Sequence, residues 1–198
     1  MRSGDDVVLY RKDMMVSGLG VQQRRDTLRK PRQLHGCRSW PASLGPLKRR
    51  QGMISMLNEL RQLLTQIEGQ SFQFVRAGAV GSMFDVDIGA DGEKGPYGIF
   101  VEQAVWELHQ DAEPVTDCDE RSDVIAERLH MLVGRRIESM ELEAETMLLL
   151  VRIQDGLELS VYFNETVLRN GYGYSIHDRE RVFCVDQGPR LYVEPRER

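Results

Sequence analysis

The clearest alternation of apolar and polar residues lies between Arg136 and Phe163, and it predicts three consecutive β-strands. Apolar residues alternate with glutamates over 140–145, residues 147–153 are almost entirely apolar, and alternation returns over 157–163. Alternation is typical of a half-buried strand, and a continuous apolar run is typical of a central strand. Asp155-Gly156 can adopt the positive φ angles of a tight hairpin turn. The segment therefore predicts an antiparallel β-meander.

Two segments with a helical period of apolar residues are predicted to form α-helices. The first begins at Met53 and ends near Gly69, a plausible C-terminal cap. Its apolar face consists of Met53, Met56, Leu57, Leu60, Leu63, Leu64 and Ile67. The second covers residues 124–133, with Ser122 or Asp123 as its N-cap and Gly134 after its end.

The remaining pattern predicts further strands and one long loop. We expect strands over residues 71–76 and 83–88, a loop rich in glycine over 89–96, and a further strand segment over 97–108. Residues 111–123 are polar and acidic, contain a proline, and are predicted to be a loop. Short strands are expected at 174–176 and 181–185, and a proline-limited edge strand at 191–193.

The order of these signals is the same in the two parts of the body. Each part reads helix, glycine, strand, strand, turn, strand and polar loop, with Gly69 matching Gly134 and residues 84–88 matching 149–153. This suggests an internal duplication of a helix-plus-meander unit, although the same order also arises by chance. We predict an α+β fold of antiparallel meanders with two helices.

Charge divides the chain into a basic N-terminal part and an acidic body. Residues 1–52 contain 12 Lys/Arg and 4 Asp/Glu, a charge of +8, and the remainder contains 14 and 27, a charge of −13. The first part has no sustained apolar period, so we predict a disordered tail and a single α+β domain over 53–198. The tail is a basic binding arm, a linker, or a segment upstream of the true start at Met53 or Met56.

Composition and spacing favour a cytoplasmic protein without a cofactor or metal. The longest apolar run, residues 147–151, is far below the ~20 residues of a membrane span, and the N-terminus has no secretory signal pattern. No phosphate-binding glycine motif is present. The residues that could bind metal or form disulfides have no telling spacing: Cys37, Cys118, Cys184, His35, His109, His130 and His177.

Acidic residues are the most distinctive feature of the body. They cluster over 102–123, and glutamates also form one face of the strand over 138–145. This is either a solvated face or a surface that attracts a basic protein. Aromatic residues near it would supply the lasting contacts. The predicted partner-binding residues are Glu107, Glu113, Asp117, Asp119, Glu120, Trp106, Tyr172 and Tyr174.

Several of these residues also carry a resemblance to a known group. The first helix ending at Gly69, the residues 97–102 followed by Trp106, the acidic loop, and residues 132–134 before the meander are similar to a group of small bacterial proteins. Members of that group are uncharacterised or assigned as immunity proteins of polymorphic toxin systems. The similarity covers about residues 53–188 and implies a protein partner and no catalytic residues.

We therefore expect a non-enzymatic binding protein of the immunity type, which neutralises a toxin domain with a basic cleft through its acidic surface. One alternative is a nucleic-acid or regulatory binding protein that uses the basic tail. Another is an enzyme whose site the sequence does not reveal. The oligomeric state does not follow from the sequence.

Overall fold

A computed structural model describes residues 46–77, 83–90, 95–163, 172–186 and 190–196 of the chain. All described residues belong to one compact unit, within Ala42–Arg198. Residues 1–45 of the predicted tail therefore lie outside the described residues. None of the helices described is both long and apolar enough to cross a membrane.

The described residues form an α+β fold with two α-helices, a short 3-10 helix and eleven strands in two antiparallel sheets. In chain order the elements are α1 Pro46–Ile67, β1 Ser71–Ala77, β2 Phe84–Gly89, β3 Tyr97–Val101, β4 Val105–Gln110, β5 Glu113–Asp117, α2 Ser122–Leu129, η1 His130–Leu132, β6 Ile137–Glu143, β7 Leu148–Ile153, β8 Leu157–Tyr162, β9 Tyr172–His177, β10 Arg181–Asp186 and β11 Arg190–Pro195.

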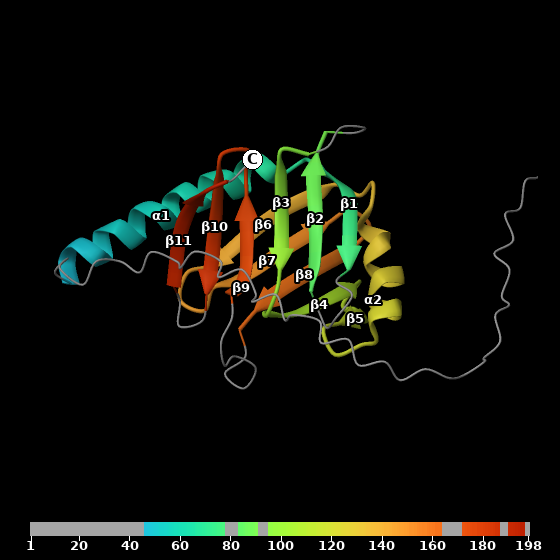
Figure 1. Cartoon of the computed structure of the whole chain (residues 1–198). Coiled ribbons are helices and arrows are strands. Elements are labelled where there is room, and N and C mark those ends of the chain that lie inside the picture. The colour runs from blue at the N-terminus through green and yellow to red at the C-terminus, as the bar shows by residue number, and fades with distance from the viewer. Residues whose placement is uncertain (1–45, 78–82, 91–94, 164–171, 187–189, 197–198) are drawn as a thin grey trace, which may run out of the picture. The chain divides into compact units, whose positions relative to one another are not determined.

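One sheet has the strand order β1-β2-β3-β9-β10-β11, and the other has the order β5-β4-β8-β7-β6. Figure 1 shows the first sheet in front of the second, with the strands of the two sheets crossing obliquely. The predicted meander is confirmed, because β7 lies between β6 and β8. Its tight turn is confirmed as well: Asp155 and Gly156 have φ angles of 64° and 72°.

A single hydrophobic core lies between the sheets. The ring of Phe84 on β2 meets the ring of Trp106 on β4 edge-on, with centroids 5.1 Å apart. Tyr174 on β9 donates its hydroxyl hydrogen to the carbonyl of Met147, in the turn between β6 and β7 of the other sheet, at 2.8 Å. Both contacts join one sheet to the other, so these large side chains hold the two layers together.

The helices cover the edges of the sheets. Helix α1 packs against the edge strands β6 and β11, and α2 packs against the edge strands β1 and β5. Leu60, Leu63 and Ile67 of α1 are buried, as the apolar period predicted, but Met53 at the predicted start of that face is exposed, because the core does not reach the first turns of the helix. The described residues thus place no helix on the outer face of either sheet.

Several predicted boundaries and one predicted cap differ from the structure. Helix α1 begins at Pro46, before the predicted start at Met53, because Pro fits the first helical turn and residues 47–51 favour helix without an apolar period. The segment over 97–108 forms two strands, β3 and β4, which belong to different sheets. Helix α2 has no side-chain cap hydrogen bond, and Asp123 pairs with Arg121 instead.

The acidic segment 111–123 is not a loop throughout. Its residues 113–117 form β5, an edge strand paired with β4, and a register shift lies beside Pro114. Proline is tolerated there because an edge strand has one side without ladder hydrogen bonds. The prediction of a loop from composition was therefore wrong for residues 113–117, which form a strand.

Gly69 and Gly134 occupy corresponding places after the two helices. Both have a φ angle of 81°. The amide of Gly69 donates to the carbonyl of Ile137 at 2.8 Å, and the amide of Gly134 donates to the carbonyl of Phe72 at 2.7 Å. The strand order β1-β2-β3-β9-β10 also has the same connectivity as β6-β7-β8-β4-β5.

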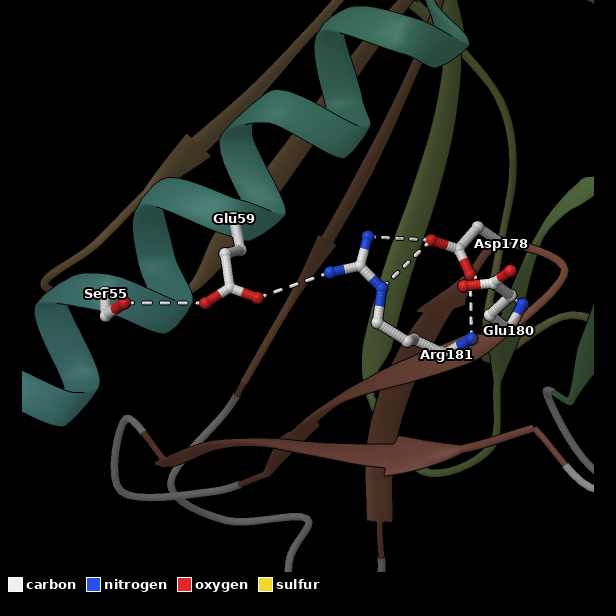
Figure 2. A network of polar contacts seen from close by, with 5 residues as sticks. All are labelled: Ser55, Glu59, Asp178, Glu180 and Arg181. Carbon is white, nitrogen blue, oxygen red and sulfur yellow. Dashed lines mark hydrogen bonds and ion pairs between the residues drawn. The ribbon is translucent and has the colours of Figure 1, made fainter.

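A polar network ties α1 to the turn between β9 and β10 (Figure 2). Asp178 accepts the backbone amides of Glu180 and Arg181 at 2.8 and 2.7 Å. Its other oxygen accepts the Arg181 guanidinium at 2.9 Å, and this guanidinium reaches Glu59 of α1 at 3.2 Å. Burial alone would raise the pKa of Asp178, but these amides and the guanidinium hold it below its usual value. The network therefore fixes the turn and links it to the helix.

Candidate protein-interaction face

The outer side of the five-stranded sheet is strongly acidic. Burial alternates along its strands, so the partly exposed positions point away from the core. We define the acidic face by its five carboxylates: Glu107, Asp117, Glu141, Glu143 and Glu158. Arg152 is the one guanidinium among the outward positions of these described strands.

The strand register places these carboxylates around an apolar centre. One row crosses all five strands in the order Glu141, Leu150, Ser160, Glu107 and Asp117. We define the apolar strip as the half-buried residues between the two acidic sides: Val105, Leu148, Leu150 and Tyr162. In a neighbouring row Glu143 lies opposite Leu148, and Val105 lies opposite Tyr162.

The one guanidinium of the face is shared by two carboxylates. Arg152 forms ion pairs with Glu141 on β6 and, at 3.6 Å, with Glu158 on β8. Because these groups are largely exposed, the pairs contribute little to stability. These two carboxylates offset the positive charge of Arg152, so the rest of the acidic face keeps its negative potential.

Glu107 contacts two neighbouring side chains on the face. It accepts the hydroxyl hydrogen of Tyr162 at 2.6 Å, and the imidazole of His109 lies 3.8 Å away. The hydrogen bond to Glu107, followed by burial, raises the pKa of Tyr162 to about 12. Burial raises the pKa of the Cys118 thiol, with a further contribution from Asp119 and Asp117. The electrostatic effects on both groups agree with a negative potential at this corner.

The predicted acidic residues divide into two groups. Glu107 and Asp117 are cross-strand neighbours on the acidic face. Glu113 is exposed at the start of β5, and Asp119 and Glu120 are exposed in the turn between β5 and α2. The amide of Asp119 donates to the carboxylate of Asp117 at 2.8 Å, so this turn continues directly from the face.

Two predicted contact residues have structural positions instead. Trp106 has 0% of its surface exposed and Tyr174 has 1%, so neither can touch a partner while the protein is folded. Their contacts with Phe84 and with Met147 hold the core together, as described above. Tyr172 begins β9, and its side chain lies outside the described residues. The aromatic residue at the surface of the acidic face is Tyr162.

The predicted partner-binding residues did not include three carboxylates of the acidic face or the aromatic residue of the apolar strip. These are Glu141, Glu143, Glu158 and Tyr162, whose strands are β6 and β8. The period-two pattern places all four on the polar side of their strands, and this signal could have found them. What the pattern does not reveal is that β8 lies beside β4, which brings Tyr162 to Glu107.

Within the described ranges no three His, Cys, Asp or Glu side chains are arranged to hold a metal ion. Buried oxygen or nitrogen atoms without a hydrogen-bond partner in the described structure are Oγ1 of Thr116 and Nε2 of His177. The His177 ring lies against the backbone of Gly98 on the outer side of the other sheet.

Comparison with known proteins gives no assignment: no protein-family model matches the chain, and neither the curated proteins nor the solved structures contain a significant match.

Proposed function

We propose that this protein is a non-enzymatic binding protein of the immunity type, and that its acidic face binds a basic protein partner in the cytoplasm. The observation that best supports this proposal is the row from Glu141 to Asp117 across five strands. This row has an apolar centre, and no helix covers it in the described structure. Interfaces commonly combine an apolar centre with a polar rim. A face of one charge sign also accelerates association with a partner of the opposite sign.

The immunity role follows from what such a face can do to a toxin. A nuclease binds phosphates with a basic cleft, and an acidic protein surface can cover that cleft and exclude the nucleic acid. Inhibition of this kind needs fast association, which long-range charge attraction supplies. No bond is made or broken by the inhibitor, so its residues act by binding alone.

The neighbouring gene provides the test. We expect it to encode a toxin domain with a basic cleft, and we expect co-production of this protein to restore growth of cells that make the domain. Purified toxin domain should bind the protein with an affinity that falls as salt is added. Growth that is not restored, together with no binding at low salt, would contradict the proposal.

A second candidate function uses the basic end of α1. Lys48, Arg49 and Arg50 lie in the first turns of this helix, so the basic N-terminal part of the sequence reaches into regular structure. Basic residues on a helix are a common means of binding nucleic-acid backbones. Binding of duplex DNA or RNA by the full chain, lost when these three residues are replaced by glutamine, would support this alternative.

We also infer that the body arose by duplication of one α-plus-five-strand unit. The reciprocal hydrogen bonds of Gly69 and Gly134 support this inference, as does the shared connectivity of the two sheets. In each sheet the three-strand meander of one half is completed by the two-strand hairpin of the other half. Under this inference neither half could complete its sheet without the other.

A further inference from the structure

We propose that the acidic face takes a basic amphipathic α-helix of its partner, laid along the apolar strip with cationic side chains on both flanks. This inference rests on the proposed function and specifies the partner's binding element. It is carried by the arrangement of apolar and acidic positions on β6, β7, β8 and β4, which the register fixes.

The width of the strip matches a helix. Glu141 on β6 and Glu107 on β4 are in one row and are separated by β7 and β8, which is three strand spacings or about 14 Å. A helix with its side chains is about 10–12 Å across. Lysine or arginine stems on the two sides of such a helix can therefore reach both carboxylates while its apolar stripe lies on Leu150.

The length of the apolar strip limits the number of apolar residues of the partner helix that can contact it. From Leu148 to Arg152 along β7 the face measures about 13 Å, which corresponds to about nine residues of helix. Two and a half turns present an apolar residue at about three positions with the spacing i, i+3 or i+4, and i+7. At the Arg152 end of the strip Glu141 and Glu158 are already paired with that guanidinium, so they are less available to the cations of a longer basic element.

Charge decides the class of partner. Anionic lipid surfaces and nucleic acids are repelled by five carboxylates around one paired guanidinium, whereas a basic protein segment is attracted. A helix laid on the open face of a sheet is a common way to form a further layer. In this body α1 and α2 pack against edge strands, which leaves the acidic face available for a layer supplied by a partner.

The test compares two synthetic peptides on the unmodified full chain. One has leucines at helical spacing and lysines on both flanks, and the other has the same composition in an order that gives no apolar stripe. Affinity is measured by fluorescence anisotropy at low salt, and helix formation by circular dichroism. We expect the amphipathic peptide to bind about tenfold more tightly and to become helical on binding.

Variants locate the binding site. The double substitution Leu148→Ser and Leu150→Ser should reduce binding of the amphipathic peptide to that of the permuted one, whereas Phe74→Ser, an exposed apolar position on the other sheet, should leave it unchanged. Equal binding of the two peptides would overturn the helix inference and leave the charge-based function standing. If neither peptide binds at low salt, the inference and the proposed function both fail. The peptide comparison does not depend on the folding of any variant.

Discussion

Gly69 and Gly134 each donate a backbone hydrogen bond to the strand that follows the other glycine, at 2.8 and 2.7 Å, and both have a φ angle of 81°. This reciprocity continues one residue further along each strand. Ile137 donates to the carbonyl of Gln70 at 2.8 Å, and Phe72 donates to that of Arg135 at 3.0 Å. The two helix ends are therefore joined to each other by backbone hydrogen bonds that do not depend on side chains.

The glycine positions predict equal effects of substitution. A Cβ at either residue would meet no atom within 4 Å, so the cost of alanine comes from the positive φ angle alone. We expect Gly69→Ala and Gly134→Ala each to lower the free energy of unfolding by about 1–2 kcal/mol. Asparagine tolerates this backbone conformation better, so Gly69→Asn and Gly134→Asn should cost less. Urea denaturation measures all four; asparagine variants as unstable as the alanine variants would contradict the explanation.

The burial of Trp106 predicts a stability effect. Trp106→Ala removes a fully buried ring in contact with Phe84 and should lower the free energy of unfolding by about 3–5 kcal/mol. Phe74→Ala is the matched control, because that ring is 49% exposed, and it should cost less than about 1 kcal/mol. Chemical denaturation would refute the assignment if the two changes had similar effects.

The hydrogen bond of the Tyr174 hydroxyl predicts a smaller decrease in the free energy of unfolding when that hydroxyl is removed. Tyr174→Phe leaves the ring in place but removes the donor to the Met147 carbonyl, which lies in the turn that joins β6 and β7 of the opposite sheet. We expect a decrease of about 1–3 kcal/mol in the free energy of unfolding, since the acceptor remains in a buried site. Tyr162→Phe, which removes a partly exposed hydroxyl from Glu107, should cost less in the same assay. The reverse order would show that the intersheet bond contributes little.

The His177 side chain predicts a dependence of stability on pH. Burial, followed by the positive charge of Arg196, lowers the pKa of His177, although Asp85, Asp87 and Asp178 oppose this. The unfolded chain therefore binds a proton more readily than the folded one. The contribution of neutral His177 is complete above the ordinary histidine pKa of about 6.5 and is lost as the pH falls through the lower folded value.

Denaturation midpoints between about pH 7.5 and 5 measure this contribution. His177→Gln should flatten the decrease in stability on acidification, whatever its effect at neutral pH. His130→Gln is the control, because His130 is exposed in the short helix η1, and it should leave the slope unchanged. An unchanged slope in the His177 variant would contradict the prediction.

The sequence predicted the parts of this fold that depend on local pattern. The meander over β6–β8, its Asp155-Gly156 turn and the buried side of α1 all follow from periodicity and turn chemistry. The strand β5 did not, because Pro114 and its acidic neighbours have the composition of a loop and only pairing with β4 makes them a strand. The hairpin β4–β5 pairs with β8, and the hairpin β9–β10 pairs with β3. This pairing joins segments that are distant in the sequence, so no local pattern encodes it.

The candidate site could likewise be predicted only in part, because local pattern shows the character of a residue but not which strands are neighbours. The acidic character of Glu107 and Asp117 is visible in the sequence, and the structure brings these two residues together on neighbouring strands. The role of Trp106 was not predictable, because an aromatic residue in an alternating segment fits a core position and a contact position equally well. The strand order decides it, since the buried side of β4 faces Phe84 of the other sheet.

The proposed function expects a toxin domain with a basic cleft, and the association rate constant with that domain tests the central claim most directly. Stopped-flow measurements at low salt would compare the wild type with the triple variant Glu107→Gln, Asp117→Asn and Glu143→Gln, which neutralises the three carboxylates of the acidic face that are not paired with Arg152. A second triple variant, Glu127→Gln, Glu180→Gln and Glu194→Gln, makes the same change in net charge away from that face. We expect the first to slow association about tenfold and to weaken its salt dependence, and the second to change it by less than about twofold. Equal rates for the two variants would contradict binding through the acidic face.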